Sequence, residues 1–365
     1  MLAAFLRTGV AALAILLYGC GASASSDLAA IERAKQSGRS VALEDGRTLF
    51  LRCTGKGSPT VLLESGYGAT SQAWYAVQPA LSRTTRVCSY DRAGSGFSSA
   101  GPEPRDGASI ARDLDTALDA ARIEGPFILV GHSAGGLYGR LFAARRAADM
   151  QGLVLLDPTV PRRAPPPPAP DGLEGLRGLA RKCLAVSEMA PQPPLDDGRW
   201  SGCVGSNPDP WAAATVRRPD AWRAQISELD NLYGRTSEQV ARIGAVLRPV
   251  PTYVFTASDT AAMAPKYGLD NPRSGLELQH EMIAGGSIEG SQQTILSSHL
   301  IMIDRPEVVI GAVEEMIRAS RAGRPPAKLP PSELATPAEA GAFSAPEGDP
   351  LKAPDAPPAA PGLQP

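Results

Sequence analysis

Short apolar runs alternate with amphipathic stretches along most of this 365-residue chain. The stretches "RSVALEDG" and "RTLFLRCTG" alternate apolar and polar positions and meet at Asp45-Gly46, which predicts a β-hairpin. Continuous apolar runs such as "TVLLESG", "PFILVGHS" and "GLVLLD" are typical of strands that are buried on both faces. The stretch "TSQAWYAVQPALSR" between two of these runs predicts a helix, and so does "GASIARDLDTALDAARI", whose apolar residues lie three and four positions apart. This alternation predicts an α/β fold, with a mostly parallel sheet covered by helices on both faces.

The alternation breaks after "GLVLLD". A Pro-rich linker, "PTVPRRAPPPPAPDG", is followed by helical patterns without a convincing strand, so we expect a helical cap over residues 159–247. Strands and helices resume at "PTYVFTAS", which gives an α/β core formed by residues 40–158 and 248–320. From about Arg321 the chain is rich in Pro and Ala and lacks apolar periodicity. Residues 321–365 are therefore expected to be a disordered tail.

The first 24 residues have the features of a signal peptide. Arg7 supplies a positive charge before "GVAALAILLYG", an apolar run that is too short to span a bilayer. Cleavage after "ASA" would begin the mature chain at Ser25, whereas "LYGC" resembles a bacterial lipobox that would leave Cys20 as a lipidated N-terminus. We favour the lipobox, and both interpretations predict export, as a periplasmic, secreted or membrane-anchored protein.

Charge and cysteine content narrow the range of partners. The net charge of −2 and the lack of a Lys/Arg block argue against nucleic acid, and membrane contact is expected only through a lipid on Cys20. No metal site is indicated, because the chain has no Cys-x-x-Cys motif or His-rich cluster. The chain has four further cysteines: Cys53, Cys88, Cys183 and Cys203. An even number in an exported protein predicts two disulfides, and the sequence leaves all three possible pairings open.

The stretch "FILVGHSAGGLYG" places Ser133 between small residues where a predicted strand becomes a helix. Such a Gly-x-Ser-x-Gly turn is typical of a nucleophile elbow. A serine hydroxyl needs a base, usually a histidine oriented by a carboxylate. Of the three histidines, His299 follows the last predicted strand and fits the expected chain order of serine, acid and histidine. His132 adjoins the serine, and His280 lies in a predicted helix as a surface or packing residue.

Two aspartates are candidates for the acid. Asp157 ends "GLVLLD" and Asp259 follows "PTYVFTAS", so both lie at the carboxyl end of a strand, where the sites of open α/β sheets gather. The oxyanion of an acyl intermediate would need backbone donors. One is the N–H of Ala134, and the other is expected in the loop after "TVLLESG", at Tyr67 or Gly68.

Four motifs together resemble the α/β-hydrolase fold superfamily, above all its exported bacterial members with a cap. They are "PTVLLESGYGATSQAW", "RVCSYDRAGSGFS", "ILVGHSAGGLYGRLFA" and "SSHLIMIDRPEVVIGAV", and the resemblance covers roughly residues 40–320. It implies an eight-stranded sheet with its second strand antiparallel and a helical cap after the sixth strand.

The resemblance also implies roles for single residues. Ser133 matches the nucleophile and His299 the base, and Asp157 is favoured as the acid with Asp259 as its rival. Ser65-Gly66 stands where the family commonly has His-Gly, which keeps the backbone donor but alters the polar contacts of the loop. Asp91 and Arg92 match structural supports near the elbow.

The strand order implied by the resemblance also bears on the cysteines. The second and fourth strands are neighbours in this superfamily, and they carry Cys53 and Cys88, so a Cys53–Cys88 disulfide is expected. The remaining pair, Cys183–Cys203, would then lie within the cap.

The sequence thus predicts a serine hydrolase that cleaves a carboxylic ester or related small acyl substrate through an acyl-enzyme, with Tyr67 and Ala134 as oxyanion donors and no cofactor. The serine argues against haloalkane dehalogenases and epoxide hydrolases, which use an aspartate at that position. An aminopeptidase of proline-iminopeptidase type is an alternative, with Glu228 and Asp230 holding the substrate amine, although both lie in a helical pattern typical of solvated residues. A non-catalytic binding protein on the same fold is a further alternative.

Overall fold

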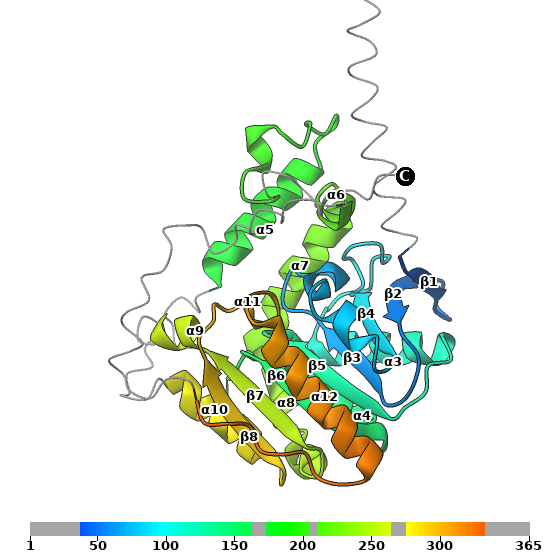
Figure 1. Ribbon diagram of the computed structural model, residues 1–365. Helices are drawn as coiled ribbons and strands as arrows, with labels where there is room; N and C mark the ends of the chain where they lie inside the picture. Colours follow the sequence, from blue (N-terminus) through cyan, green and yellow to red (C-terminus); the bar gives the residue numbers. More distant parts are fainter. Residues whose placement is uncertain (1–36, 163–172, 205–209, 264–274, 333–365) are drawn as a thin grey trace, which may run out of the picture.

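The computed structural model describes residues 37–162, 173–204, 210–263 and 275–332. One sheet of eight strands runs through the centre (Figure 1). The strands are β1 (Arg39–Ala42), β2 (Thr48–Thr54), β3 (Thr60–Glu64), β4 (Val87–Asp91), β5 (Phe127–His132), β6 (Met150–Leu156), β7 (Thr252–Ala257) and β8 (Gly290–Ile295).

The sheet has the order β1-β2-β4-β3-β5-β6-β7-β8. Strand β2 is antiparallel to both β1 and β4, and the pairs from β4 through to β8 are parallel. The turn between β1 and β2 contains Gly46 with a φ of 82°, a conformation that glycine adopts without strain. The predicted fold class, including the antiparallel second strand, is confirmed.

Helices follow most strands. They are η1 (Ser71–Trp74), α2 (Gln78–Leu81), α3 (Gly107–Ala120), α4 (Gly135–Arg145), η2 (Ala147–Asp149), α5 (Glu174–Ser187), η3 (Gly198–Trp200), α6 (Pro210–Val216), α7 (Pro219–Asn231), η4 (Leu232–Thr236), α8 (Ser237–Ala241), η5 (Gly244–Leu247), α9 (Ser258–Met263), α10 (Gly275–Gly285), α11 (Ile301–Asp304) and α12 (Pro306–Ala322).

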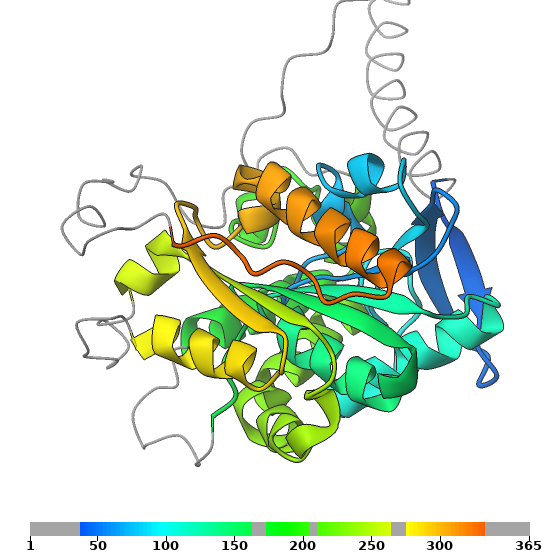
Figure 2. The same cartoon turned by 60° about the horizontal axis from the view of Figure 1, so that its bottom comes forward.

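Apolar side chains bury both faces of the parallel strands. Along β5, Phe127 and Leu129 pack into a core that includes α3 and α4, whereas Ile128 and Val130 pack into a core that includes α12. Figure 2 shows α12 on one side of the sheet and α3, α4 and α10 on the other. The continuous apolar runs of the sequence therefore correspond to strands that are covered on both sides, as predicted.

One predicted helix is two short pieces. The stretch "TSQAWYAVQPALSR" forms the 3₁₀ turn η1 and then α2. Pro79 stands in the first turn of α2, and because proline lacks an N–H and its ring clashes with the preceding turn, a helix cannot run through it unbroken. The single helix expected here was wrong for that reason.

A helical segment, from α5 to η5, separates β6 from β7 in the chain. In Figure 1, α5, α6 and α7 stand above the sheet and lead down to α8 beside it. The upper part has its own apolar core, in which Trp200 and Trp222 pack with Cys183 between α5 and α7. Part of the proline-rich linker, residues 163–172, lies outside the described residues.

Two disulfides join the expected pairs. Cys53 and Cys88 face each other on the neighbouring strands β2 and β4. Cys183, on α5, is bonded to Cys203, just after η3, within the helical segment. These pairings are compatible with an exported protein, in which disulfides persist.

The described chain continues past the expected start of the tail. Helix α12 ends at Ala322, and residues 323–332 then run along the edge strand β8 (Figure 2). Leu329 packs into the apolar core, and its N–H donates to Ser291 Oγ at 3.1 Å. These contacts explain why the boundary expected at residue 321 was too early. The expected signal peptide, Cys20, Ser25 and residues 333–365 lie outside the described residues.

Within the described part of the chain, the helices fall short of the length and apolarity that a membrane crossing requires.

Candidate active site

Ser133 lies on a sharp turn between β5 and α4. Its φ is 52°, in the left-handed region that residues other than glycine rarely adopt. The turn is held by the backbone, since Ser133 N donates to Leu156 O at 3.0 Å and Ser133 O accepts from Gly136 N at 2.9 Å. A residue with a side chain could not replace Gly135, because its Cβ would lie 2.5 Å from Glu64 O. The sequence of small residues thus permits the close approach of β3 that this turn requires.

His299 and Asp157 meet at the same edge of the sheet. Asp157 directly follows β6, and His299 lies in the loop after β8. His299 Nδ1 lies 2.7 Å from Asp157 Oδ2, and because a carboxylate only accepts, Nδ1 carries the proton. His299 Nε2 is then the basic nitrogen of the ring. The imidazole is 43% exposed, whereas the carboxylate is 1% exposed, so the base faces solvent and its partner is buried.

The backbone and charge surroundings of Asp157 suit an ionised carboxylate. The second carboxylate oxygen, Oδ1, accepts from Ala257 N at 3.1 Å. The backbone φ of Asp157 is 41°. Burial opposes ionisation, but the hydrogen bond and the charge of His299 outweigh it and hold the pKa of Asp157 below its ordinary value. The carboxylate is therefore present at neutral pH.

Asp259, the rival acid, lies in the first turn of α9. Its carboxylate accepts from Ser258 Oγ at 3.3 Å, and its N–H donates to Ser297 O at 3.2 Å. Among the described residues it makes no hydrogen bond to His299. The structure brings Asp157, and not Asp259, to the histidine.

The other two histidines support the loops around Ser133. His132 is 3% exposed, and its Nε2 lies 2.9 Å from the His299 carbonyl, to which it can only donate. Burial, and then the neighbouring charge of His299, lower the pKa of His132 to about 3, so its ring is neutral. His280 is fully buried, with Nε2 2.8 Å from Pro158 O and Nδ1 2.9 Å from Thr256 Oγ1. It is a packing residue that holds the turn after Asp157, and not a surface one.

Within the described residues, the Ser133 hydroxyl makes no hydrogen bond to His299. Such bonds are often long in enzymes without substrate and tighten when it binds. The two residues are linked through His132, which precedes Ser133 and whose ring centroid is 4.6 Å from that of His299.

The backbone N–H groups expected to bind an oxyanion are available beside the elbow. Those of Ala134 and Tyr67 donate to no other group in the described part of the chain. The loop of residues 65–68 packs against the elbow, because a Cβ added to Gly66 would lie 3.3 Å from Ser133 Cβ. Ser65, in place of the commoner histidine, ties this loop down: its Oγ donates to Thr70 O at 2.9 Å and accepts from Trp74 Nε1 at 3.0 Å.

A buried ion-pair network below this loop was missed by the sequence reasoning. Arg92 is 2% exposed and lies between two buried carboxylates, Glu64 from the end of β3 and Glu228 from α7. Burial alone would lower the pKa of Arg92, but Glu228 and Glu64 raise it well above its ordinary value, so the guanidinium is charged. The expectation that Glu228 is solvated was wrong, because its partner Arg92 directly follows β4 and lies 136 residues away in the chain.

The remaining predicted residues have clear places. Asp91, at the end of β4, accepts from Ser71 N at 2.8 Å and from Phe97 N at 3.0 Å, and so holds two loops. Asp230, unlike Glu228, is on the surface, where it pairs with Arg177 at 3.0 Å.

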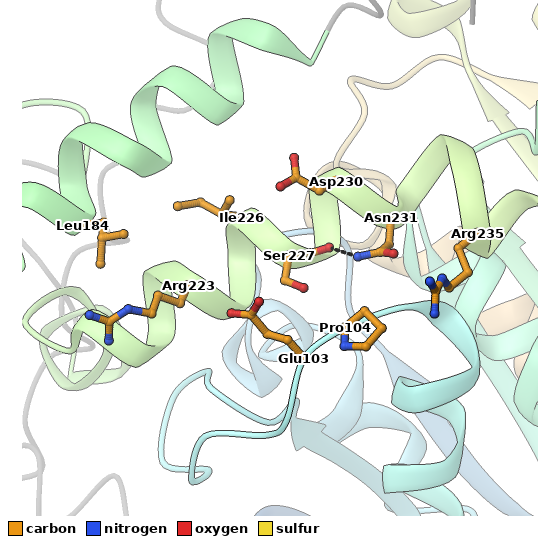
Figure 3. Close-up of a pocket in the computed structure, with 9 residues that line it drawn as sticks. All are labelled: Glu103, Pro104, Leu184, Arg223, Ile226, Ser227, Asp230, Asn231 and Arg235. Carbon is orange, nitrogen blue, oxygen red and sulfur yellow. Dashed lines mark hydrogen bonds between the residues drawn. The ribbon is translucent and has the colours of Figure 1, made fainter. Parts of the chain in front are cut away.

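A cavity of about 510 Å³ lies between α7 and the stretch that precedes α3 (Figure 3). In Figure 3, Asn231 bonds to the Ser227 carbonyl, and Asp230 and Arg235 stand along the same helical run. Ser133, His299 and Asp157 are not among its lining residues, so it is a feature separate from the candidate site. The lining residues are Glu103, Pro104, Leu184, Arg223, Ile226, Ser227, Asp230, Asn231 and Arg235.

Comparison with known proteins gives partial matches in sequence and a broad match in structure. A family model described as "alpha/beta hydrolase fold" matches residues 59–188. The probable transporter efuK of Hormonema carpetanum is 37% identical over 132 residues, which are 32% of this chain and 19% of that protein. The putative carbamate hydrolase RutD of Azorhizobium caulinodans is 32% identical over 109 residues, 30% of this chain and 40% of that protein. The chain therefore matches less than half of the length of these curated relatives.

Among solved structures, the epoxide hydrolase CorEH aligns with 78% of this chain and 99% of its own, with a TM-score of 0.56. The sequence identity is 16%, so this likeness concerns the fold.

Proposed function

We propose that this chain, which has an eight-stranded α/β sheet and matches a model of the alpha/beta hydrolase fold over residues 59–188, is a serine hydrolase acting on a carboxylic ester or a related acyl substrate. The observation that carries the proposal is the 2.7 Å hydrogen bond from His299 Nδ1 to the buried Asp157 carboxylate. This bond lies beside Ser133, whose left-handed backbone is typical of a nucleophile elbow.

In the first half of the reaction, Ser133 Oγ attacks the acyl carbonyl carbon while His299 Nε2 takes the hydroxyl proton. Asp157 keeps the ring in the required tautomer and stabilises the imidazolium. The C–O bond to the leaving group then breaks, and His299 returns the proton to the departing alcohol. The product is an acyl-enzyme on Ser133.

In the second half, His299 takes a proton from water, whose oxygen attacks the acyl carbon. The bond to Ser133 Oγ breaks, the proton returns to the serine, and a carboxylic acid leaves. The N–H groups of Ala134 and Tyr67 would hold the oxyanion in both halves. One such donor contributes about 3–4 kcal/mol of transition-state stabilisation in serine hydrolases.

The aminopeptidase alternative is less well supported. It requires carboxylates that are free to bind a substrate amine, but Glu228 is paired with Arg92, and Asp230 with Arg177. We keep as proposals that the helices between β6 and β7 form a cap over the site, and that the protein is exported with a lipid on Cys20. Mass spectrometry of the mature N-terminus distinguishes that lipid from a chain beginning at Ser25.

The test is hydrolysis of p-nitrophenyl esters, from acetate to decanoate, by the purified protein and by Ser133→Ala and His299→Ala. We expect activity on at least part of the series and its loss in both variants. A fluorophosphonate should label the protein and fail to label Ser133→Ala. If the protein and Ser133→Ala are equally inactive on every ester and neither is labelled, the proposal is overturned and a non-catalytic binding role takes its place.

A further inference from the structure

The Gly66–Tyr67 peptide, whose N–H is the second oxyanion donor in the proposed function, is held by a buried guanidinium. Arg92 Nη2 donates to Gly66 O at 2.7 Å, and Arg92 Nη1 donates to Ser65 O at 2.7 Å. Gly66 O and Tyr67 N–H belong to the same planar peptide unit. Fixing the carbonyl therefore fixes the direction in which the Tyr67 N–H points.

The guanidinium also affects the strength of that donor. The positively charged guanidinium, which is hydrogen-bonded to the carbonyl oxygen, draws electron density across the peptide toward that oxygen. Hydrogen-bonded groups in a low-dielectric site polarise one another in this way. The Tyr67 N–H becomes a better donor to an oxyanion at the same time as it is aimed. Arg92 makes these contacts while 2% exposed, so water does not screen them.

Arg92 is itself held from the helical segment. Its Nε and Nη2 donate to the two carboxylate oxygens of Glu228 at 3.2 and 3.1 Å. Its Nη1 donates in addition to Glu64 Oε1 at 2.9 Å. All five N–H groups of the guanidinium are thereby used, a pattern that lysine, with its single ammonium, cannot reproduce.

We propose that Arg92 and Glu228 are positioning residues for the oxyanion hole: Arg92 aims the Gly66–Tyr67 peptide, and Glu228 of α7 holds Arg92 in place. The helical segment between β6 and β7 then takes part in transition-state stabilisation, through one carboxylate that does not touch the substrate. This inference rests on the proposed function and adds residues to it.

The experiment compares Glu228→Gln with the unsubstituted protein and with Asp230→Asn. Glutamine keeps the shape of the side chain but removes its charge and turns one acceptor into a donor facing Arg92. Asp230 is two residues further along α7, on the surface and paired with Arg177 rather than Arg92, so it is a matched control for the loss of one negative charge. The readouts are kcat and KM on the best p-nitrophenyl ester, and the inhibition constant of an alkyl trifluoromethyl ketone with the same acyl chain.

The ketone forms a tetrahedral adduct on the serine and places its oxyanion in the hole. We expect Glu228→Gln to lower kcat by at least about tenfold and to weaken the ketone in parallel, because a misplaced oxyanion donor acts on the transition state. KM should stay within about twofold, since ground-state binding is not affected. Asp230→Asn should match the unsubstituted protein.

Each other outcome overturns the inference. If Glu228→Gln has unchanged kcat and ketone binding, the carboxylate does not position the hole. If activity falls only in proportion to the folded fraction, measured by circular dichroism and fluorophosphonate end-point labelling, its role is confined to folding. Should Glu228→Gln fail to fold, Arg92→Lys takes its place, and its kcat and the inhibition constant of the ketone are measured in the same way. If the unsubstituted protein neither hydrolyses esters nor binds the ketone, the proposed function itself fails and the inference falls with it.

Discussion

Replacing Asp157 with asparagine exchanges one oxygen for an NH₂ group and reverses one hydrogen bond. Asp157 Oδ1 accepts from Ala257 N at 3.1 Å, and asparagine can keep that contact through its own Oδ1. Its Nδ2 then faces His299 Nδ1, which must become an acceptor. The proton of the imidazole moves to Nε2, and the nitrogen that should take the Ser133 proton can no longer do so.

The size of the effect follows from this change of tautomer. The equivalent substitution in a Ser-His-Asp protease lowers kcat by about 10⁴ with the geometry intact, which corresponds to about 5 kcal/mol of transition-state stabilisation. Here too the carboxylate is buried and bonded to the imidazole, with 1% exposure and a distance of 2.7 Å from His299 Nδ1 to Asp157 Oδ2. We therefore expect Asp157→Asn to lose at least about 10³ of kcat on p-nitrophenyl esters.

Asp259→Asn is the matched control, because Asp259 also follows a strand at this edge but contacts Ser258 and Ser297. It should keep its activity within about threefold, as expected of a residue outside the reacting groups. Thermal unfolding of both variants checks that they are folded. An active Asp157→Asn beside an inactive Asp259→Asn would refute the reasoning, and would mean that the loop carrying His299 rearranges in solution.

Three further predictions concern stability. Ser133→Gly should be about 1 kcal/mol more stable than Ser133→Ala in chemical unfolding, because glycine adopts a φ of 52° without the cost that a side chain brings; equal stability would show that the elbow is unstrained. Burial raises the pKa of Glu64 from 4.5 to about 7. Between pH 4.5 and about 7 the folded state therefore keeps a proton that the unfolded state has lost, and the free energy of unfolding falls as the pH rises through this window. In urea titrations at several pH values, Glu64→Gln should lack this loss of about 3 kcal/mol, and parallel pH curves for the two proteins would contradict the assignment. Replacing both Cys183 and Cys203 by serine opens a cross-link over 20 residues and should cost about 3 kcal/mol, read as a lower denaturation midpoint; a midpoint that does not move would show that α5 and η3 stay together without the bond.

The sequence predicts the core of the site because its signals are local. The Gly-x-Ser-x-Gly turn, the strand before it and the helix after it lie within a dozen or so residues, and they gave Ser133 and its elbow directly. His299 followed from the expected chain order and from its place after the last predicted strand. The disulfide Cys53–Cys88 followed from the strand order that the resemblance implied, in which β2 and β4 are neighbours.

What the sequence could not decide depends on contacts between distant segments. Asp157 and Asp259 follow the neighbouring parallel strands β6 and β7, so pattern and position describe both equally well. The choice is made by the path of the loop after β8, which brings His299 to only one of them. Glu228 has the spacing of a solvated helix residue, and only Arg92, from the other end of the core, accounts for its burial.

Residues 323–332 also determine where the sheet ends. Strand β8 is the last strand of the sheet, and an uncovered edge of this kind offers its peptide groups to any other chain in an extended conformation. Here Thr294 N donates to Ser332 Oγ at 2.9 Å, and Lys328 Nζ donates to Gly290 O at 3.1 Å, so side chains occupy groups that an additional strand would use. The covering segment, residues 323–332, contains four prolines, which have no backbone N–H to donate to a ninth strand. The sheet is thereby closed against growth at this edge, which protects the protein from edge-to-edge aggregation.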